Sequence, residues 1–135
     1  MKIEGKHIII DAFECDSSYL NDIIKIEKMC IKAAKDADME VLSSHFHQFE
    51  PQGLTGILVL STSHLSIHTW PEERYASLDF YTCGDQDLNG QVEYLLKELS
   101  SKKAMVSSIS RGVFNPQLIK FDEISAVHNF KSEET

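Results

Sequence analysis

Hydrophobic and polar residues alternate along the chain with two periods, one typical of strands and one typical of helices. Residues 7–14 are short, apolar and β-branched, which predicts a strand. Residues 17–37 carry apolar side chains at three- and four-residue spacing, which predicts one helix capped at Asp16 or at the serines that follow it. A second helical stripe follows the possible cap Asp87 and consists of Leu88, Val92, Leu95, Leu96 and Leu99.

Strand-like patterns fill most of the remaining chain. They cover residues 40–49, 55–70, 75–82 and 104–114. The expected order is therefore β-α-β-β-β-α-β, and the run of consecutive strands in its middle favours an antiparallel sheet. Two helices on one face of that sheet give a two-layer α+β sandwich, a single domain over residues 1–135. The opposite face of the sheet is expected to be covered as well, and a partner subunit is the simplest candidate.

Composition and charge narrow the choice of partners. The chain has 135 residues, of which 42% are hydrophobic and 25% charged, as in an ordinary globular domain. Its formal net charge of −8 argues against a general phosphate-backbone binder, so no nucleic-acid partner is expected. No stretch approaches the roughly 18 apolar residues of a membrane span, and the N-terminus lacks the features of a signal peptide. We expect a cytoplasmic protein that does not enter a membrane.

Three cysteines, Cys15, Cys30 and Cys83, are too few to pair completely and show no C-x-x-C spacing. They are expected to be free thiols of a reducing compartment, with neither a disulfide framework nor a zinc site. Cys30 lies on the apolar stripe of the first helix, which predicts a position in the core.

Residues 60–72, "LSTSHLSIHTWPE", gather more chemistry than a strand requires. A Ser/His pair is compatible with a hydrolase, but the nucleophile-elbow pattern G-x-S-x-G is absent. His64 and His68 are not part of an H-E-x-x-H motif and have no evident third ligand, so no metal is expected. In a strand, these two histidines share a face with Ser66.

Several segments together resemble the bacterial S-adenosylmethionine decarboxylases. The residues that carry the resemblance are "SHLSIHTWPE" (63–72), "LDFYTCG" (78–84), "FHQFEPQGLTG" (46–56), "DAFECD" (11–16) and, more weakly, "SISRG" (108–112). The resemblance runs from about residue 5 to 115, with a long ungapped block between Phe46 and Gly84.

The resemblance implies a self-processing proenzyme. Ser63 is expected to attack the carbonyl of Thr62, so that cleavage gives a β chain (1–62) and an α chain (63–135) headed by a pyruvoyl group derived from Ser63. In the family, a hydroxyl residue at the position of Thr55 supports the tetrahedral intermediate, and the histidine at His68 removes the α-proton. Taken without the family, Thr55 and His68 are also compatible with ordinary strand residues.

The resemblance also implies a decarboxylase of S-adenosylmethionine that supplies the aminopropyl donor for spermidine. The substrate amine forms a Schiff base with the pyruvoyl ketone, which acts as an electron sink in place of a pyridoxal cofactor. Cys83 is the expected proton donor, and a thiol is mostly protonated at neutral pH.

Four residues are expected, by the same resemblance, to bind the substrate. Glu72 corresponds to the carboxylate that accepts hydrogen bonds from the ribose hydroxyls, and Phe49 to a ring that stacks on adenine. Phe13 and Glu14 correspond to the aromatic and acidic pair that closes the other side of the site, with Glu14 facing the sulfonium. Without the family, Phe13 and Phe49 are equally compatible with core packing.

Strand parity bears on the assembly of the site. Ser63 and His68 are five residues apart, so in a regular strand they point to opposite faces. A bulge would turn the two side chains to the same face. Alternatively, a C2 homodimer would let Ser63 of one subunit meet His68 of the other, and this is the arrangement that we predict. Each of its two composite sites takes Ser63 and Cys83 from one subunit and a second set of residues from the other: Phe49, Thr55, His68 and Glu72.

One residue departs from the family pattern, because Thr62 stands where the family has glutamate. Weaker recognition of the substrate and a slower cleavage, through altered strain at a β-branched residue, are the expected consequences. Two other readings stay open: a pyruvoyl enzyme for a basic amino acid such as arginine or ornithine, and an unprocessed binding homologue. Glu72 counts against the first, and the set of Thr55, His68 and Cys83 counts against the second.

Overall fold

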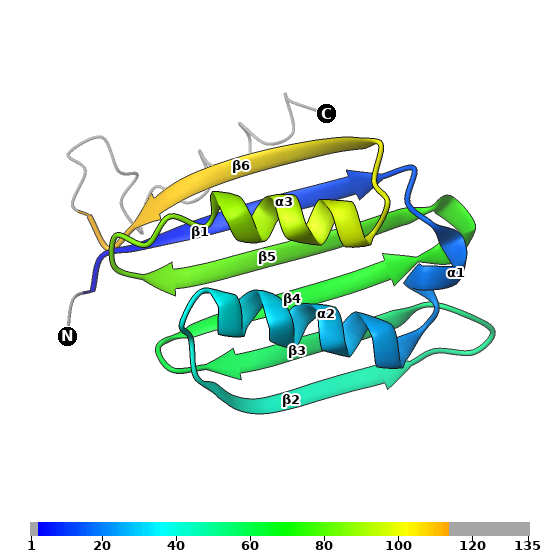
Figure 1. The fold of residues 1–135 in the computed structure, drawn as a ribbon, viewed down its shortest axis with the longest axis horizontal. Coiled ribbons are helices and arrows are strands. Elements are labelled where there is room, and N and C mark those ends of the chain that lie inside the picture. Colours follow the sequence, from blue (N-terminus) through cyan, green and yellow to red (C-terminus); the bar gives the residue numbers. More distant parts are fainter. Residues whose placement is uncertain (1–2, 114–135) are drawn as a thin grey trace, which may run out of the picture.

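The structure, a computed structural model, describes residues 3–113. Its six strands form one antiparallel sheet in the order β2-β3-β4-β5-β1-β6 (Figure 1). The strands are β1 (Gly5–Phe13), β2 (Val41–Gln48), β3 (Leu54–Leu60), β4 (Ser63–Trp70), β5 (Tyr75–Cys83) and β6 (Lys103–Arg111). The helices are α1 (Ser17–Leu20), α2 (Ile23–Asp36), α3 (Asn89–Glu98) and the short 3₁₀ helix η1 (Pro71–Glu73).

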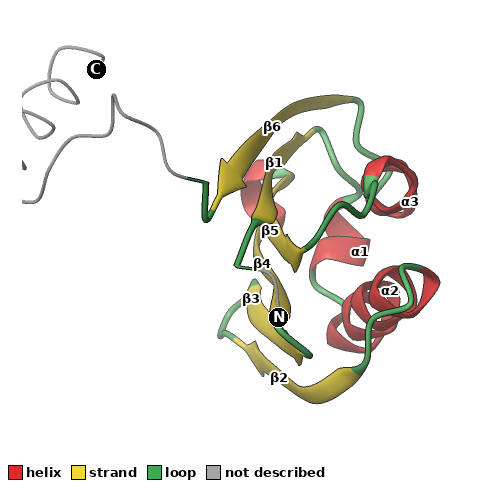
Figure 2. Ribbon diagram, turned by 90° about the vertical axis from the view of Figure 1, so that its left-hand side faces the viewer, coloured by secondary structure: helices red, strands yellow, loops and turns green. Residues whose placement is uncertain are grey.

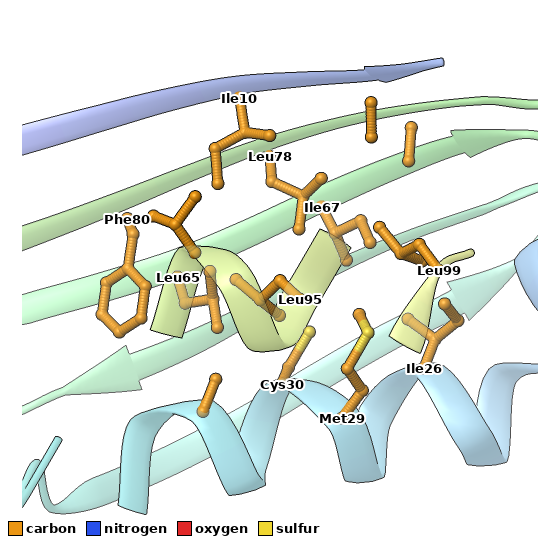
Figure 3. Packing of buried hydrophobic residues seen from close by; sticks show 14 of the residues in the cluster. Ile10, Ile26, Met29, Cys30, Leu65, Ile67, Leu78, Phe80, Leu95 and Leu99 are labelled. Carbon is orange, nitrogen blue, oxygen red and sulfur yellow. The ribbon is translucent and has the colours of Figure 1, made fainter. Parts of the chain in front are cut away.

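Among residues 3–113, three α-helices lie on one face of the sheet and none covers the other, which is called the bare face below (Figure 2). The prediction of a two-layer α+β sandwich is therefore confirmed. Between the layers, the side chains of α2 and α3 pack on the central strands (Figure 3). The buried contributors from α2 and α3 include Ile26, Met29, Cys30 and Leu95, and Leu99, directly after α3, is buried with them.

Cys30 is fully buried in this core, as the sequence predicts. Burial raises the pKa of its thiol to about 12, and the nearby charge of Glu27 acts in the same direction. A thiol held so firmly in its protonated form is a poor nucleophile, so Cys30 serves packing.

The prediction of one helix over residues 17–37 is wrong, because the structure forms two helices there. The Asp16 carboxylate accepts a hydrogen bond from the Tyr19 amide at 3.2 Å and caps α1. The Asp22 carboxylate accepts one from the Lys25 amide at 3.1 Å and caps α2. Asp22 therefore starts a second helix in the middle of the segment, even though the spacing of the apolar residues continues unchanged across it.

The prediction of one strand over residues 55–70 is also wrong, because this segment is a hairpin. Strands β3 and β4 are joined by a tight turn at Ser61 and Thr62, where Thr62 takes the left-handed conformation with φ of 59°. The turn contains no glycine or proline, so the sequence gives little sign of it. It sets Thr55 directly opposite His68 across the hairpin.

The bare face of the sheet carries the polar residues of β4. Leu65 and Ile67 are buried under the helices, whereas His64, Ser66 and His68 alternate with them on the opposite face, as predicted. Exposed apolar residues lie on the same bare face, at Ile9, Ile57, Val59, Met105 and Ile109. Within residues 3–113, none of the helices is long and apolar enough to cross a membrane.

Candidate active site

The first part of the site lies at the end of the sheet where β4 begins and β5 ends. Ser63 is the first residue of β4, directly after the turn, and Cys83 is the last residue of β5. The Cys83 thiol donates a hydrogen bond to the carbonyl oxygen of Thr62, with Sγ 3.1 Å from that oxygen. Ser63 and Cys83 both line a hollow of about 340 Å³, whose wall also includes the acidic residues Asp38 and Glu40. The thiol therefore touches the peptide bond that the sequence predicts to break.

Thr62 holds a strained backbone conformation at the same bond. A left-handed φ costs an L-residue about 1–2 kcal/mol, and a β-branched side chain is among the least suited to it. The Thr62 hydroxyl donates to the carbonyl of Ser61 at 2.6 Å, a local bond that accompanies the turn. Strain and a hydrogen-bond donor thus meet at one carbonyl group, immediately before Ser63.

Tyr81 and Arg111 form the surroundings of the thiol. The Tyr81 hydroxyl lies 3.9 Å from Cys83 Sγ, and the hydrogen bond with Cys83 raises the pKa of Tyr81. The guanidinium of Arg111 lies over the Tyr81 ring, 5.1 Å from its centroid. The phenol therefore stays neutral beside the thiol, and the two side chains share a face because they are two residues apart on β5.

The second part of the site lies at the opposite end of β4. Thr55 Oγ1 and His68 Nδ1 are 3.0 Å apart, because β3 and β4 pair these two residues directly. Phe49 follows the end of β2 and packs edge-on against His47, with ring centroids 4.7 Å apart. A second hollow of about 340 Å³ lies here, and its lining includes Phe49, Thr55, His68, Trp70 and Glu72. Four residues assigned to the site from the sequence therefore do meet.

Phe13 and Glu14 lie at this second end and not beside Ser63. Phe13 ends β1, and its ring stacks on Tyr75 at 5.2 Å between centroids. Trp70 stacks on Tyr75 from the other side, at 5.3 Å. The three rings form a row across β1, β5 and β4. The row lies at the end of the sheet where β4 and β1 finish, and Figure 1 shows the two strands ending on the same side. Sequence reasoning missed Trp70 and Tyr75, although Trp70 stands inside the diagnostic motif.

The two parts are too far apart to act together within one chain. Ser63 and His68 are separated by five residues of a continuous strand, which corresponds to about 17 Å at the rise of a strand. Their side chains also alternate to opposite faces of β4, since no bulge interrupts its pairing with β3 or β5. Each chain therefore presents two half-sites.

A further cluster occupies the middle of the bare face. The Nε2 atoms of His7 and His64 lie 2.5 Å and 2.8 Å from Asp79 Oδ2, and the Ser66 hydroxyl donates to the other carboxylate oxygen. Burial opposes the ionisation of Asp79, but the hydrogen bonds from Ser66, His64 and His7 outweigh it and lower the pKa of that carboxyl.

Two histidines and a carboxylate also form a possible metal-ligand set, with ligand atoms within 4.8 Å of one another. Arg111 approaches His7 Nδ1 at 3.4 Å, and a guanidinium can only donate. Nδ1 therefore accepts, which places the His7 proton on Nε2, facing Asp79. The geometry favours a hydrogen-bond network over metal ligation. Sequence reasoning missed the cluster because its members come from β1, β4 and β5.

Comparison with known proteins adds independent findings. A sequence model described as S-adenosylmethionine decarboxylase matches residues 6–112. A protein of Pyrococcus horikoshii named S-adenosylmethionine decarboxylase proenzyme is 43% identical over 110 residues, which cover 81% of this chain and 79% of that one. A Moorella thermoacetica protein of the same name is 40% identical over 118 residues, or 86% and 94% of the two chains. The crystal structure of the adenosylmethionine decarboxylase from Aquifex aeolicus is 33% identical, with a TM-score of 0.77 over 89% of this chain and all of that one.

Proposed function

The chain belongs to the S-adenosylmethionine decarboxylase family, and from this premise we propose that it cleaves itself between Thr62 and Ser63 and then decarboxylates S-adenosylmethionine. The product is the aminopropyl donor for spermidine synthesis. The observation that carries the proposal is the hydrogen bond from Cys83 to the carbonyl of the strained residue Thr62, next to the Ser63 hydroxyl.

Self-cleavage begins with the Ser63 hydroxyl. Its oxygen bonds to the Thr62 carbonyl carbon and the C–N bond breaks, which gives an ester and a free amine. The Cys83 thiol donates toward the carbonyl oxygen, where negative charge develops. Loss of the Ser63 α-proton to His68 of the partner subunit then expels the Thr62 carboxylate. The dehydroalanine that remains takes up water and releases ammonia, so residue 63 becomes a pyruvoyl group.

The residues around position 63 suit a pyruvoyl group. It supplies an electrophilic ketone for the substrate amine and an electron sink for the electron pair left by CO2. Ser63 is the first residue of a strand, so cleavage makes it a chain end, and it lines a hollow large enough for part of a substrate. Cys83 holds a proton on Sγ at this position, where it can be delivered to the carbon that loses CO2.

The second half-site supplies the binding groups. Phe49 and Phe13 are 46% and 37% exposed, so each ring has a free face on which adenine can stack. Glu72, on η1, is exposed and able to accept hydrogen bonds from the ribose hydroxyls. Glu14 supplies a negative charge for the sulfonium at the same end of the sheet.

A C2 homodimer brings the half-sites together. The separation of Ser63 from His68 supports it, because a second copy packed bare face to bare face with its strands reversed can place the end of the sheet that carries one chain's Ser63 and Cys83 beside the other chain's His68. The exposed apolar residues of the bare face support the same interface. In this dimer, Ser63 and Cys83 come from one subunit, and the other subunit contributes Phe13, Glu14, Phe49, Thr55, His68 and Glu72.

The cysteines bear on where this chemistry takes place. Cys15, Cys30 and Cys83 are all free thiols, and the first two are buried. Unpaired thiols support the reducing cytoplasm as the compartment.

The intact mass of the purified protein tests the proposal. Two fragments divided between residues 62 and 63 are expected, with the larger one labelled by a carbonyl reagent. The Ser63→Ala variant should remain one chain and should be inactive. CO2 release should be found with S-adenosylmethionine and not with arginine or ornithine. A single unlabelled chain would instead favour the non-catalytic homologue, and release from arginine or ornithine alone would favour the basic amino acid enzyme.

A further inference from the structure

Arg74 joins two segments of the chain that are far apart in sequence. Its Nε atom donates to the Cys15 carbonyl at 2.8 Å, and a terminal guanidinium nitrogen donates to the Glu14 carbonyl at 3.3 Å. Its own carbonyl accepts the Cys15 amide at 3.0 Å. Arg74, the residue directly after η1, is therefore bound through three hydrogen bonds to the loop that follows β1.

Further contacts join the segment after β1 to both ends of η1. The Ser17 hydroxyl donates to the Pro71 carbonyl at 3.0 Å, so the loop is tied to the start of η1 as well as to its end. Glu14 and Arg74 both take left-handed backbone conformations, with φ of 54° and 53°. Such turns are disfavoured for residues other than glycine, and they persist where surrounding contacts hold them. The hydrogen bonds to Arg74 are contacts of that kind.

We propose that Arg74 is a positioning residue that holds Glu14 in a fixed place relative to Glu72. The inference rests on the proposed function, in which Glu14 faces the sulfonium and Glu72 binds the ribose. Glu72 lies on η1, between the two tied ends, and Glu14 lies directly beside Cys15. Arginine suits this task because its planar fork reaches two successive carbonyl groups, whereas lysine offers a single point of contact.

The charge of Arg74 permits a clear test, because its direct effect on the substrate opposes its positioning effect. A guanidinium near the site repels a sulfonium, so removing the charge alone should strengthen binding of the substrate. Removing the two guanidinium hydrogen bonds loosens the loop that carries Glu14 and should weaken binding. The sign of the change in KM therefore distinguishes the two roles.

Arg74→Met removes the guanidinium hydrogen bonds and the charge, and Arg74→Lys keeps the charge with one contact. We expect KM for S-adenosylmethionine to rise roughly three- to tenfold in Arg74→Met, the range of one or two modest hydrogen bonds, with kcat nearly unchanged. Arg74→Lys should lie between it and the wild type. Glu73→Asp keeps the charge of an exposed neighbour that makes no hydrogen bond or ion pair within residues 3–113, and it should match the wild type.

Cleavage between Thr62 and Ser63 provides the internal control for folding, because it requires the dimer with Ser63, Cys83 and the partner subunit's His68 in place but does not involve binding of the substrate. Cleaved Arg74→Met protein with an unchanged or lowered KM would overturn the proposal. A merely structural role would reduce cleavage or lower the melting temperature of Arg74→Met while the active fraction kept a normal KM. That result would overturn the proposal too.

Hydrogen exchange separates failure of this inference from failure of the proposed function. In the Arg74→Met variant, amide exchange in the segment 13–17 should become faster, and this holds whether or not the protein acts on S-adenosylmethionine. If the wild type releases no CO2, the proposed function fails while the exchange result still tests the junction. Unchanged exchange in the segment 13–17 would show that Arg74 does not hold the loop.

Discussion

The Sγ atom of Cys83 lies 3.1 Å from the carbonyl oxygen of Thr62, which belongs to the peptide bond proposed to break. One thiol is therefore placed for two tasks. Before cleavage it can donate to the oxygen that becomes negatively charged, and afterwards it can donate a proton to the substrate. Each task uses the same S–H group, so a single substitution should affect both.

Replacing Cys83 by alanine should slow cleavage about tenfold and turnover at least a hundredfold. The first effect is modest because a thiol is a weak hydrogen-bond donor, whereas loss of a general acid typically costs 10² or more. A time course of the two fragments on a denaturing gel measures cleavage, and CO2 release from the fully cleaved variant measures turnover. Normal turnover by that variant would refute the proton-donor role.

Replacing Thr62 by glycine should slow cleavage roughly fivefold. The left-handed conformation raises the free energy of the uncleaved chain by about 1–2 kcal/mol, and glycine removes most of that strain. Part of the strain is released as the bond breaks, so the strained threonine should be cleaved faster than glycine at this position. The slower cleavage expected for threonine in place of the family's glutamate stays a prediction. The rate of fragment formation measures the effect, with Thr62→Ser as a control that keeps the hydroxyl and a side chain in the left-handed turn. Faster cleavage in the glycine variant would contradict it.

Coexpression of Ser63→Ala with His68→Ala should restore cleavage that neither variant achieves alone. In a mixed dimer, one composite site contains the intact Ser63 of one chain and the intact His68 of the other. Only the chain that carries His68→Ala should be cut, and at most half of the mixed dimers' sites should work. Mass spectrometry of differently tagged chains identifies which chain is cut. If the mixed sample remains uncleaved, the composite site is wrong.

The Asp79 network should make folding stability fall at acid pH. The pKa of Asp79 is lower in the folded protein than its ordinary value near 4, so the folded state favours the carboxylate. This contribution is present above about pH 4 and is lost as the pH falls through the lower folded value. Chemical unfolding of the uncleaved Ser63→Ala protein, with and without Asp79→Asn, measures it. The asparagine variant should lose less stability below pH 4, and equal acid sensitivity in both would contradict the prediction.

Much of the fold and the chemistry could be predicted from local patterns. Periodicity located the strands β1, β2 and β5 and the apolar stripe of α3, because each element repeats its own short-range geometry. The motif around Ser63 led to the proposed reacting residues, since the proposed chemistry needs those side chains in that order. The placement of the Ser63 and His68 side chains on opposite faces of β4 also followed from the sequence, because the two residues are an odd number of positions apart on one strand.

Other features depended on contacts between distant segments. The hairpin at Thr62, the approach of Cys83 to that carbonyl, and the placement of Glu14 beside η1 each require strands or loops to meet across the sheet. Periodicity describes the faces of one element but carries no information about which element pairs with it, so these relationships appear only when the chain has folded. Long-range pairing therefore decided which predicted residues stand together, and it divided them between the two ends of β4.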